Sequence, residues 1–174
     1  MQTISLEKSV EMIPNGATLM IGGFMAVGTP ERVVDELVRQ EKRDLTVIAN
    51  DTAMPNRGIG KLVSAKRVRK AIVSHIGLNP ETQRQMMAGE IQVDLVPQGT
   101  LIERIRAGGF GLGGVLTQTG LGTTVADASS GSRSTGKATW SNLRCAPTSP
   151  WYTHSWPTIS ATSATPLPRV TSIR

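Results

Sequence analysis

The feature that most constrains this chain is a glycine-rich stretch from Asn15 to Pro30 that reads NGATLMIGGFMAVGTP. Residues Thr18–Ile21 form a short apolar run typical of a strand, the segment Gly22–Gly28 follows at once, and Pro30 suits the first turn of a helix. Free backbone N–H groups in such a loop and at a helix start favour negatively charged groups, and glycine allows a close approach. The pattern predicts a loop that binds an anionic ligand. A tight strand–helix turn without a ligand is the alternative.

Apolar runs of strand length alternate with helical patterns along the first 127 residues. The expected strands are Thr18–Ile21, Leu45–Ala49, Val68–Ser74 and Ile91–Val96. The expected helices are Ser5–Ile13, Pro30–Gln40, Asn79–Ala88 and Thr100–Ala107. Such alternation predicts an α/β fold, an open parallel sheet with helices on both faces. We expect this domain to occupy residues 1–127 and to be truncated at its C-terminal end.

Polar or glycine-rich segments stand at the ends of all four expected strands. They are Gly22–Gly28, Asn50–Thr52, Ser74–Gly77 and Pro97–Thr100. Ligands of open α/β sheets bind beyond the carboxyl ends of the strands. We therefore expect these segments to converge on a polar crevice.

Charge is distributed unevenly along the chain. The 174 residues carry a net charge of +6, which alone would suggest nucleic acid or an acidic surface as a partner. Residues 1–127 hold 14 Lys and Arg against 13 Asp and Glu, whereas residues 128–174 hold five basic residues and no acidic ones. The excess charge therefore belongs to a basic tail, residues 128–174, in which 18 of 47 residues are Ser or Thr.

Nothing in the sequence predicts a membrane or secretory destination. The longest apolar runs have strand length, and the N-terminal MQTISLEKS lacks the apolar core of a signal peptide. The single cysteine, Cys145, excludes an internal disulfide and fits a reducing compartment. We expect a cytoplasmic protein with no membrane partner.

Several segments give the chain a family resemblance from Ser5 to about Val125. Besides the glycine-rich stretch they are RDLTVIANDTA, SHIGLNPET, GEIQVDLVPQGTLIERIRAGG and GLGGVLTQTGLGT. In order and spacing they resemble the alpha subunit of family I coenzyme A-transferases. The segment GLGGVLT is closer to the acetate and acetoacetate (short-chain fatty acid) branch than to the 3-oxoacid branch, which usually has GVPAFYT there.

The resemblance implies a ping-pong transfer of CoA from an acyl-CoA to a short-chain carboxylate. A glutamate forms an acyl-glutamyl anhydride and then a glutamyl-CoA thioester, which is covalent catalysis by a carboxylate. In two-subunit members this glutamate lies on the beta subunit, and this sequence contains no matching motif. Glu81, Glu90 and Glu103 are expected to be surface carboxylates. The resemblance thus implies a beta-subunit partner in an α2β2 heterotetramer, CoA as a substrate, and no permanently bound cofactor or metal.

The resemblance also assigns site residues. The loop associated with CoA is Gly22, Gly23, Phe24, Met25, Ala26, Val27 and Gly28. Gln98 matches a glutamine that helps to form an oxyanion hole, for which a side-chain amide is a suitable donor. Asn50 matches a polar position near the same site and is assigned to CoA binding together with the loop. For Gln98 and Asn50 the alternative is turn chemistry at a strand end.

The basic tail has two interpretations. A disordered basic arm with three Trp and one Tyr could stack on single-stranded nucleic acid. We favour the other, in which the tail is read out of frame after a base is lost or gained near Asp127. The neighbouring frame permits LRAD, LGNL and ARNFNP in order, strings that resemble the next part of the family. We then expect a disordered tail and no nucleic-acid partner. Rival functions are a 3-oxoacid or 3-oxoadipate transferase subunit and an inactive truncated product.

Overall fold

The computed structural model describes residues 4–112, 114–117, 119–120, 123, 130–134 and 137–143. Its helices are α1 (Leu6–Glu11), α2 (Glu31–Arg39), α3 (Gly60–Ser64), α4 (Pro80–Met87) and α5 (Gln98–Gly109). Its strands are β1 (Thr18–Met20), β2 (Leu45–Ile48), β3 (Val68–Val73), β4 (Gln92–Leu95), β5 (Gly114–Thr117), β6 (Ser130–Ser134) and β7 (Lys137–Leu143). None of the described helices is long and apolar enough to cross a membrane.

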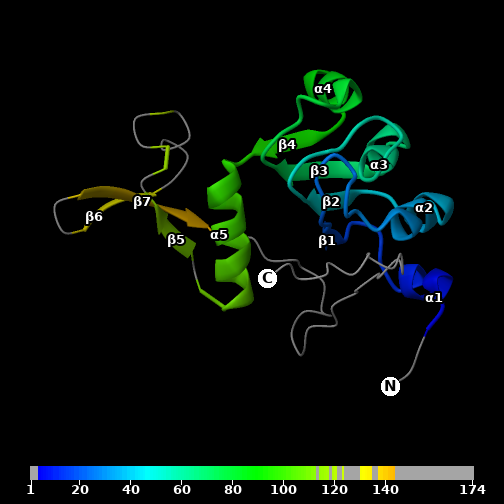
Figure 1. Ribbon diagram of the computed structural model, residues 1–174, viewed down its shortest axis with the longest axis horizontal. Coiled ribbons are helices and arrows are strands. Elements are labelled where there is room, and N and C mark those ends of the chain that lie inside the picture. The colour runs from blue at the N-terminus through cyan, green and yellow to red at the C-terminus, as the bar shows by residue number, and fades with distance from the viewer. Residues whose placement is uncertain are drawn as a thin grey trace, which may run out of the picture.

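The main sheet contains four parallel strands in the order β1-β2-β3-β4 (Figure 1). Each strand pairs with the one before it in the chain, as in the register Thr18 to Thr46 and Lys70 to Gln92. Crossovers between parallel neighbours are right-handed, so α2, α3 and α4 all lie on one face of the sheet. Helix α5 lies on the other (Figure 1). The predicted α/β fold, an open parallel sheet with helices on both faces, is confirmed.

Two apolar clusters lie on opposite faces of the sheet, because successive side chains of a strand point to opposite sides. The larger cluster lies under α2–α4 and contains Val47, Val73, Leu37 and Leu62, each at most 1% exposed. The smaller cluster lies under α5 and joins Ile48 to Leu101 and other residues. Burying each such side chain stabilises the fold by about 1.5–3 kcal/mol.

Strand positions agree with the sequence to within about one residue, but two helices differ. Helix α5 begins at Gln98, two residues before the expected start, and it includes Gly108 and Gly109 instead of ending before them. The glycine pair is tolerated because it lies in the last turn, where few hydrogen bonds depend on it. Helix α3 was not expected, since its five residues GKLVS are too few to show a helical period.

A second, antiparallel sheet has the order β5-β7-β6 and stands beyond α5 (Figure 1). Strands β6 and β7 belong to the basic tail, and the expectation that this tail is out of frame and disordered stays a prediction. Strand β7 pairs with β5 on one side and with β6 on the other, and it includes the strand-favouring types Thr139 and Trp140. The rest of the tail lies outside the described residues, and the domain boundary near Asp127 stays a prediction.

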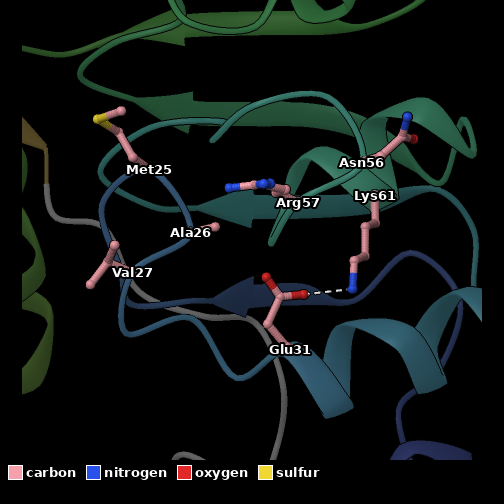
Figure 2. Close-up of a pocket in the computed structure, with 7 residues that line it drawn as sticks. All are labelled: Met25, Ala26, Val27, Glu31, Asn56, Arg57 and Lys61. Atoms are coloured by element: carbon pink, nitrogen blue, oxygen red, sulfur yellow. Dashed lines mark ion pairs between the residues drawn. The ribbon is translucent and has the colours of Figure 1, made fainter.

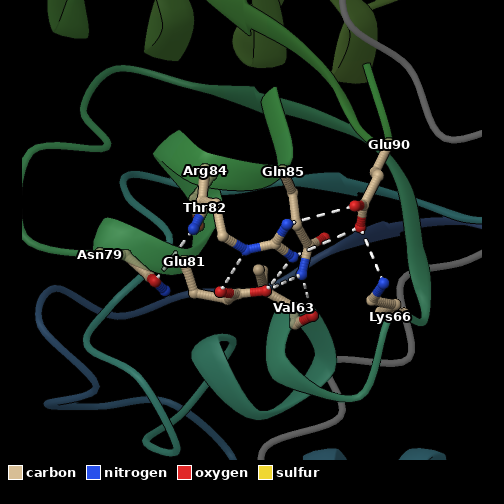
Figure 3. A network of polar contacts seen from close by, with 8 residues as sticks. All are labelled: Val63, Lys66, Asn79, Glu81, Thr82, Arg84, Gln85 and Glu90. Atoms are coloured by element: carbon tan, nitrogen blue, oxygen red, sulfur yellow. Dashed lines mark hydrogen bonds and ion pairs between the residues drawn. The ribbon is translucent and has the colours of Figure 1, made fainter. Parts of the chain in front are cut away.

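Polar side chains attach α4 to its neighbours (Figure 3). Asn79 is fully buried: its Oδ1 accepts from the Thr82 N–H at 3.2 Å, which caps the helix, and its Nδ2 donates to the Thr52 carbonyl at 2.9 Å. Gln85 donates to the Val63 carbonyl of α3 at 2.9 Å. These contacts hold α3 and α4 together and fix the loop that follows β2.

The expected surface carboxylates are paired with arginines. Glu81 accepts two hydrogen bonds from Arg84, at 2.7 and 2.9 Å, and Glu90 accepts two longer ones from the same guanidinium, at 3.2 and 3.4 Å. The Arg84 bonds, followed by one from Gln85, lower the pKa of Glu81 to about 2. Glu103 pairs with Arg106 at 3.4 Å.

Candidate functional site

The carboxyl ends of the parallel strands bring three polar segments into contact at one edge of the main sheet. The Ser74 hydroxyl donates to the Asn50 carbonyl at 2.7 Å, and Asp51 forms a parallel bridge with His75. The Met25 N–H of the glycine-rich loop donates to Asp51 Oδ2 at 2.9 Å. The loops after β1, β2 and β3 therefore form one connected surface.

The glycine-rich loop is a compact turn with unusual backbone geometry. Phe24 and Val27 exchange two backbone hydrogen bonds, at 3.0 and 2.9 Å. The turn between them places Met25 at φ 52° and Ala26 at φ 71°, the left-handed region that side chains disfavour by about 1–2 kcal/mol. Backbone strain of this kind collects at functional sites, where the surrounding structure enforces it.

The N–H groups of this loop are only partly available to a ligand. Those of Phe24, Met25 and Val27 are already bonded within the protein. Neither Gly23 nor Gly28 forms a hydrogen bond with a described residue. The loop can thus offer a ligand fewer donors than its length suggests, and the N–H groups of Gly22, Gly23, Ala26 and Gly28 are the candidates.

Asp51 is the residue that holds the loop, and the sequence did not single it out. Its side chain is 2% exposed; Oδ2 accepts from Met25 N–H and Oδ1 from Ala53 N–H at 3.1 Å. The sequence signal that could have identified Asp51 is its position at the end of a buried strand. A buried carboxylate that binds two backbone donors fixes both loops relative to each other.

Replacing Asp51 with asparagine is expected to lower the free energy of unfolding by about 1–3 kcal/mol, because one of the two N–H groups loses its acceptor. Urea denaturation of the chain measures this loss, and amide exchange at Met25 and Ala53 locates it. Asp35→Asn is the control, at a carboxylate whose side chain is 59% exposed; it should cost under about 1 kcal/mol. Equal effects of the two substitutions would contradict the role of Asp51.

An open pocket of about 460 Å³ lies beside the glycine-rich loop (Figure 2). The residues that line it are Met25, Ala26, Val27, Glu31, Asn56, Arg57 and Lys61. The loop after β1 supplies the first three, and the segment between β2 and α3 supplies Asn56 and Arg57. In Figure 2 the Arg57 side chain extends toward the loop that carries Met25 and Ala26.

Ion pairs hold the two walls of the pocket together. Lys61 Nζ lies 2.6 Å from Glu31 Oε2 and 2.6 Å from Asp35 Oδ1. These contacts, that with Asp35 first, raise the pKa of Lys61. Glu31 Oε1 also accepts from the Gly58 N–H at 2.8 Å. Helix α2 is thereby joined to the loop before α3.

The two predicted amide residues have different surroundings. Asn50 is half-buried and its Oδ1 accepts from the Ser74 hydroxyl at 3.1 Å, so its side chain supports the strand ends. Gln98 is exposed at the first residue of α5, and its side chain bonds no described residue. It follows β4, three strand spacings or roughly 14 Å across the sheet from β1. The structure does not bring Gln98 against the glycine-rich loop.

Comparison with known proteins places this geometry in a family. The family model described as coenzyme A transferase matches residues 3–144. The chain belongs to the coenzyme A transferase family. The match runs beyond Asp127, so the family pattern extends into the region of β6 and β7.

This coenzyme A transferase chain has similar curated relatives. It is 57% identical over 122 residues to the acetate CoA-transferase subunit alpha of Escherichia coli (strain K12), a match that covers 70% of the chain and 56% of the relative. It is 53% identical over 122 residues, with the same coverage, to the acetoacetyl-CoA:acetate/butyrate CoA transferase alpha subunit of Clostridium acetobutylicum. The chain spans about half the length of these relatives.

Solved structures support the fold of this family member. An acyl-CoA transferase of Escherichia coli O157:H7, solved as a thioester complex with CoA, matches with a TM-score of 0.72 and 22% identity. The match covers 83% of this chain and 32% of that one.

Proposed function

We propose that this chain acts as the alpha subunit of a CoA-transferase that moves CoA from an acyl-CoA to a short-chain carboxylate of the acetate or acetoacetate type. The observation that carries the proposal is the identity of 57% over 122 residues with an acetate CoA-transferase subunit alpha. The connected surface of those loops supports it, because ligands of open α/β sheets bind there.

The proposed mechanism is a ping-pong transfer at a shared site. A glutamate of the beta subunit attacks the acyl-CoA carbonyl, CoA thiolate leaves, and an acyl-glutamyl anhydride forms. The thiolate then attacks the glutamyl carbonyl and releases the first carboxylate. The incoming carboxylate attacks the glutamyl-CoA thioester, which releases CoA thiolate and forms a new acyl-glutamyl anhydride. The thiolate then attacks the new acyl carbonyl, which forms the product acyl-CoA and regenerates the glutamate. We propose an α2β2 assembly in the cytoplasm with no permanently bound cofactor.

The alpha chain contributes binding and charge stabilisation in this proposal. Residues 22–28 bind the CoA substrate, and Asn50 supports the strand ends beneath it. Gln98 donates a hydrogen bond to the oxyanion that develops on the thioester oxygen. Its amide has no partner among the described residues, and the N-terminal end of α5 favours negative charge.

Gln98→Ala is expected to lower kcat of the complex with the beta subunit by about 100-fold while CoA binding changes little, because the lost donor acts on the transition state. Thioester absorbance gives kcat, and calorimetry gives the Kd for CoA. Gln92→Ala is the matched control, since the side chain of Gln92 bonds only Asp94, at 3.3 Å, among the described residues. Unchanged turnover would remove Gln98 from the site.

The preferred carboxylate acceptor is identified by measuring kcat/KM for several acceptors under the same conditions. Acetate is expected to give a higher kcat/KM than succinate or 3-oxoadipate in the same complex; acetoacetate, itself a 3-oxo acid, does not separate the two types. A preference for either dicarboxylate would move the chain to the 3-oxoacid or 3-oxoadipate type. No transfer to any acceptor would contradict the proposed function.

A further inference from the structure

The charge balance of the pocket beside the glycine-rich loop leaves one group without a partner. Glu31 and Lys61 pair with each other, and Lys61 also pairs with Asp35. Arg57 is exposed, and its guanidinium makes no hydrogen bond or ion pair with any described residue. It is the one charged side chain of the pocket lining without a counter-ion in the described part of the chain.

The position of Arg57 is set by the backbone around it. The Arg57 N–H donates to the Met54 carbonyl at 3.2 Å, and the Arg57 carbonyl accepts from Gly60 N–H at 2.9 Å. The next residue, Gly58, donates to Glu31, which ties the turn to α2. The guanidinium thus starts from a fixed point and reaches over the pocket toward the glycine-rich loop (Figure 2).

Other donors lie on the same loop. Ala26, which lines the pocket, keeps an N–H group without a partner among the described residues, and so do Gly23 and Gly28, which flank the turn. A guanidinium presents several N–H donors in a planar fork that matches the oxygens of phosphate and carboxylate groups. The lining therefore combines one free positive charge with nearby neutral donors.

The geometry points to Arg57 as the residue of this pocket that binds an anionic oxygen group of the substrate. This inference rests on the proposed function and deepens it, because an acyl-CoA carries phosphates and the second substrate carries a carboxylate. Both sources present the same chemistry to the guanidinium. We expect the phosphate end of CoA, since the pocket volume of about 460 Å³ exceeds what one small carboxylate fills.

The test is equilibrium binding to the full 174-residue chain in complex with the beta subunit. Arg57→Gln is expected to raise the Kd for CoA by about 5- to 10-fold, the loss of one charge-assisted hydrogen bond at an open site. Arg57→Lys should recover part of the affinity, because it keeps the charge but not the fork. The difference between wild type and Arg57→Gln should shrink as salt is added.

Two comparisons locate the contact. Pantetheine, which has no phosphate, should bind wild type and Arg57→Gln equally. Arg69→Gln is the matched control, since Arg69 is exposed on β3, lies outside the pocket lining and has no described partner. Thermal unfolding of both variants verifies that the fold is retained.

The outcomes separate this inference from the proposed function. A raised KM for acetate with unchanged CoA affinity would assign Arg57 to the carboxylate instead of the phosphate. Unchanged CoA affinity and unchanged KM in Arg57→Gln would overturn the inference while transfer continued. Binding of CoA that depends on Arg57 without any transfer would count against the proposed function alone.

Discussion

Replacing Gly23 with alanine is expected to reduce CoA transfer by the assembled enzyme by at least about 100-fold, the effect of misplacing a binding loop by about 1 Å. Gly23 has φ +117°, which side chains rarely adopt. A Cβ there would lie 2.3 Å from Thr29 Oγ1 and 2.9 Å from Thr29 N. The loop must therefore move. The transfer rate at saturating substrates measures the loss.

The neighbouring glycine provides the control for this experiment. A Cβ at Gly22 would meet no heavy atom within 4 Å, and its φ is not in the left-handed region. Gly22→Ala should keep most of the activity. Full activity in Gly23→Ala would contradict the role given to the loop conformation. Equal losses in both variants would indicate close approach of the ligand to the backbone instead of a change in loop shape.

Alanine at Gly60 is expected to lower the free energy of unfolding by about 2–4 kcal/mol, because a buried methyl group would collide with the main chain. Its Cβ would lie 1.9 Å from the Met54 carbonyl oxygen and 3.3 Å from Asn79 Nδ2. A backbone atom cannot move aside as a flexible side chain can. The start of α3 and the buried Asn79 contacts would shift together.

Urea denaturation of the chain measures this cost. Gly99→Ala is the matched control, since Gly99 lies in α5 with no heavy atom within 4 Å of the added Cβ. That substitution should leave stability unchanged or raise it by up to about 1 kcal/mol through helix propensity. A Gly60→Ala midpoint equal to that of wild type would show that the segment before α3 repacks freely.

Local patterns were sufficient to predict the main sheet. The apolar runs LTVIA and IQVDLV indicated strands. Strand β2 is buried at all four positions, as expected of a parallel strand covered on both faces, whereas Gln92 and Leu95 of the edge strand β4 are exposed. Asn79 followed by Pro80 indicated a helix start, and the structure has that cap. Helix α3 escaped prediction because five residues give no period. Strands β6 and β7 escaped it because their Ser- and Thr-rich composition suggested disorder, and because the pairing of β7 with β5 joins residues that are distant in the sequence.

The site was predictable only where it is local in sequence. The glycine-rich loop and the strand-end segments could be located, because a strand, a glycine run and a helix start are consecutive. The contact of Met25 with Asp51 spans 26 residues, and that of Gly58 with Glu31 spans 27. Such contacts depend on the paths of whole loops. The unpaired charge of Arg57 could not be predicted for the same reason, because the charges that lie near a side chain depend on the folded chain.

The strand order of the main sheet has a consequence for how this protein is made. Since β2, β3 and β4 each pair with the strand just before them, every new strand finds its neighbour already synthesised. A chain that leaves the ribosome from its N-terminus can add one strand and its helix at a time. Contacts between sequence neighbours also reduce the loop-closure entropy that slows folding. The loop edge can therefore assemble from β1 outward during translation.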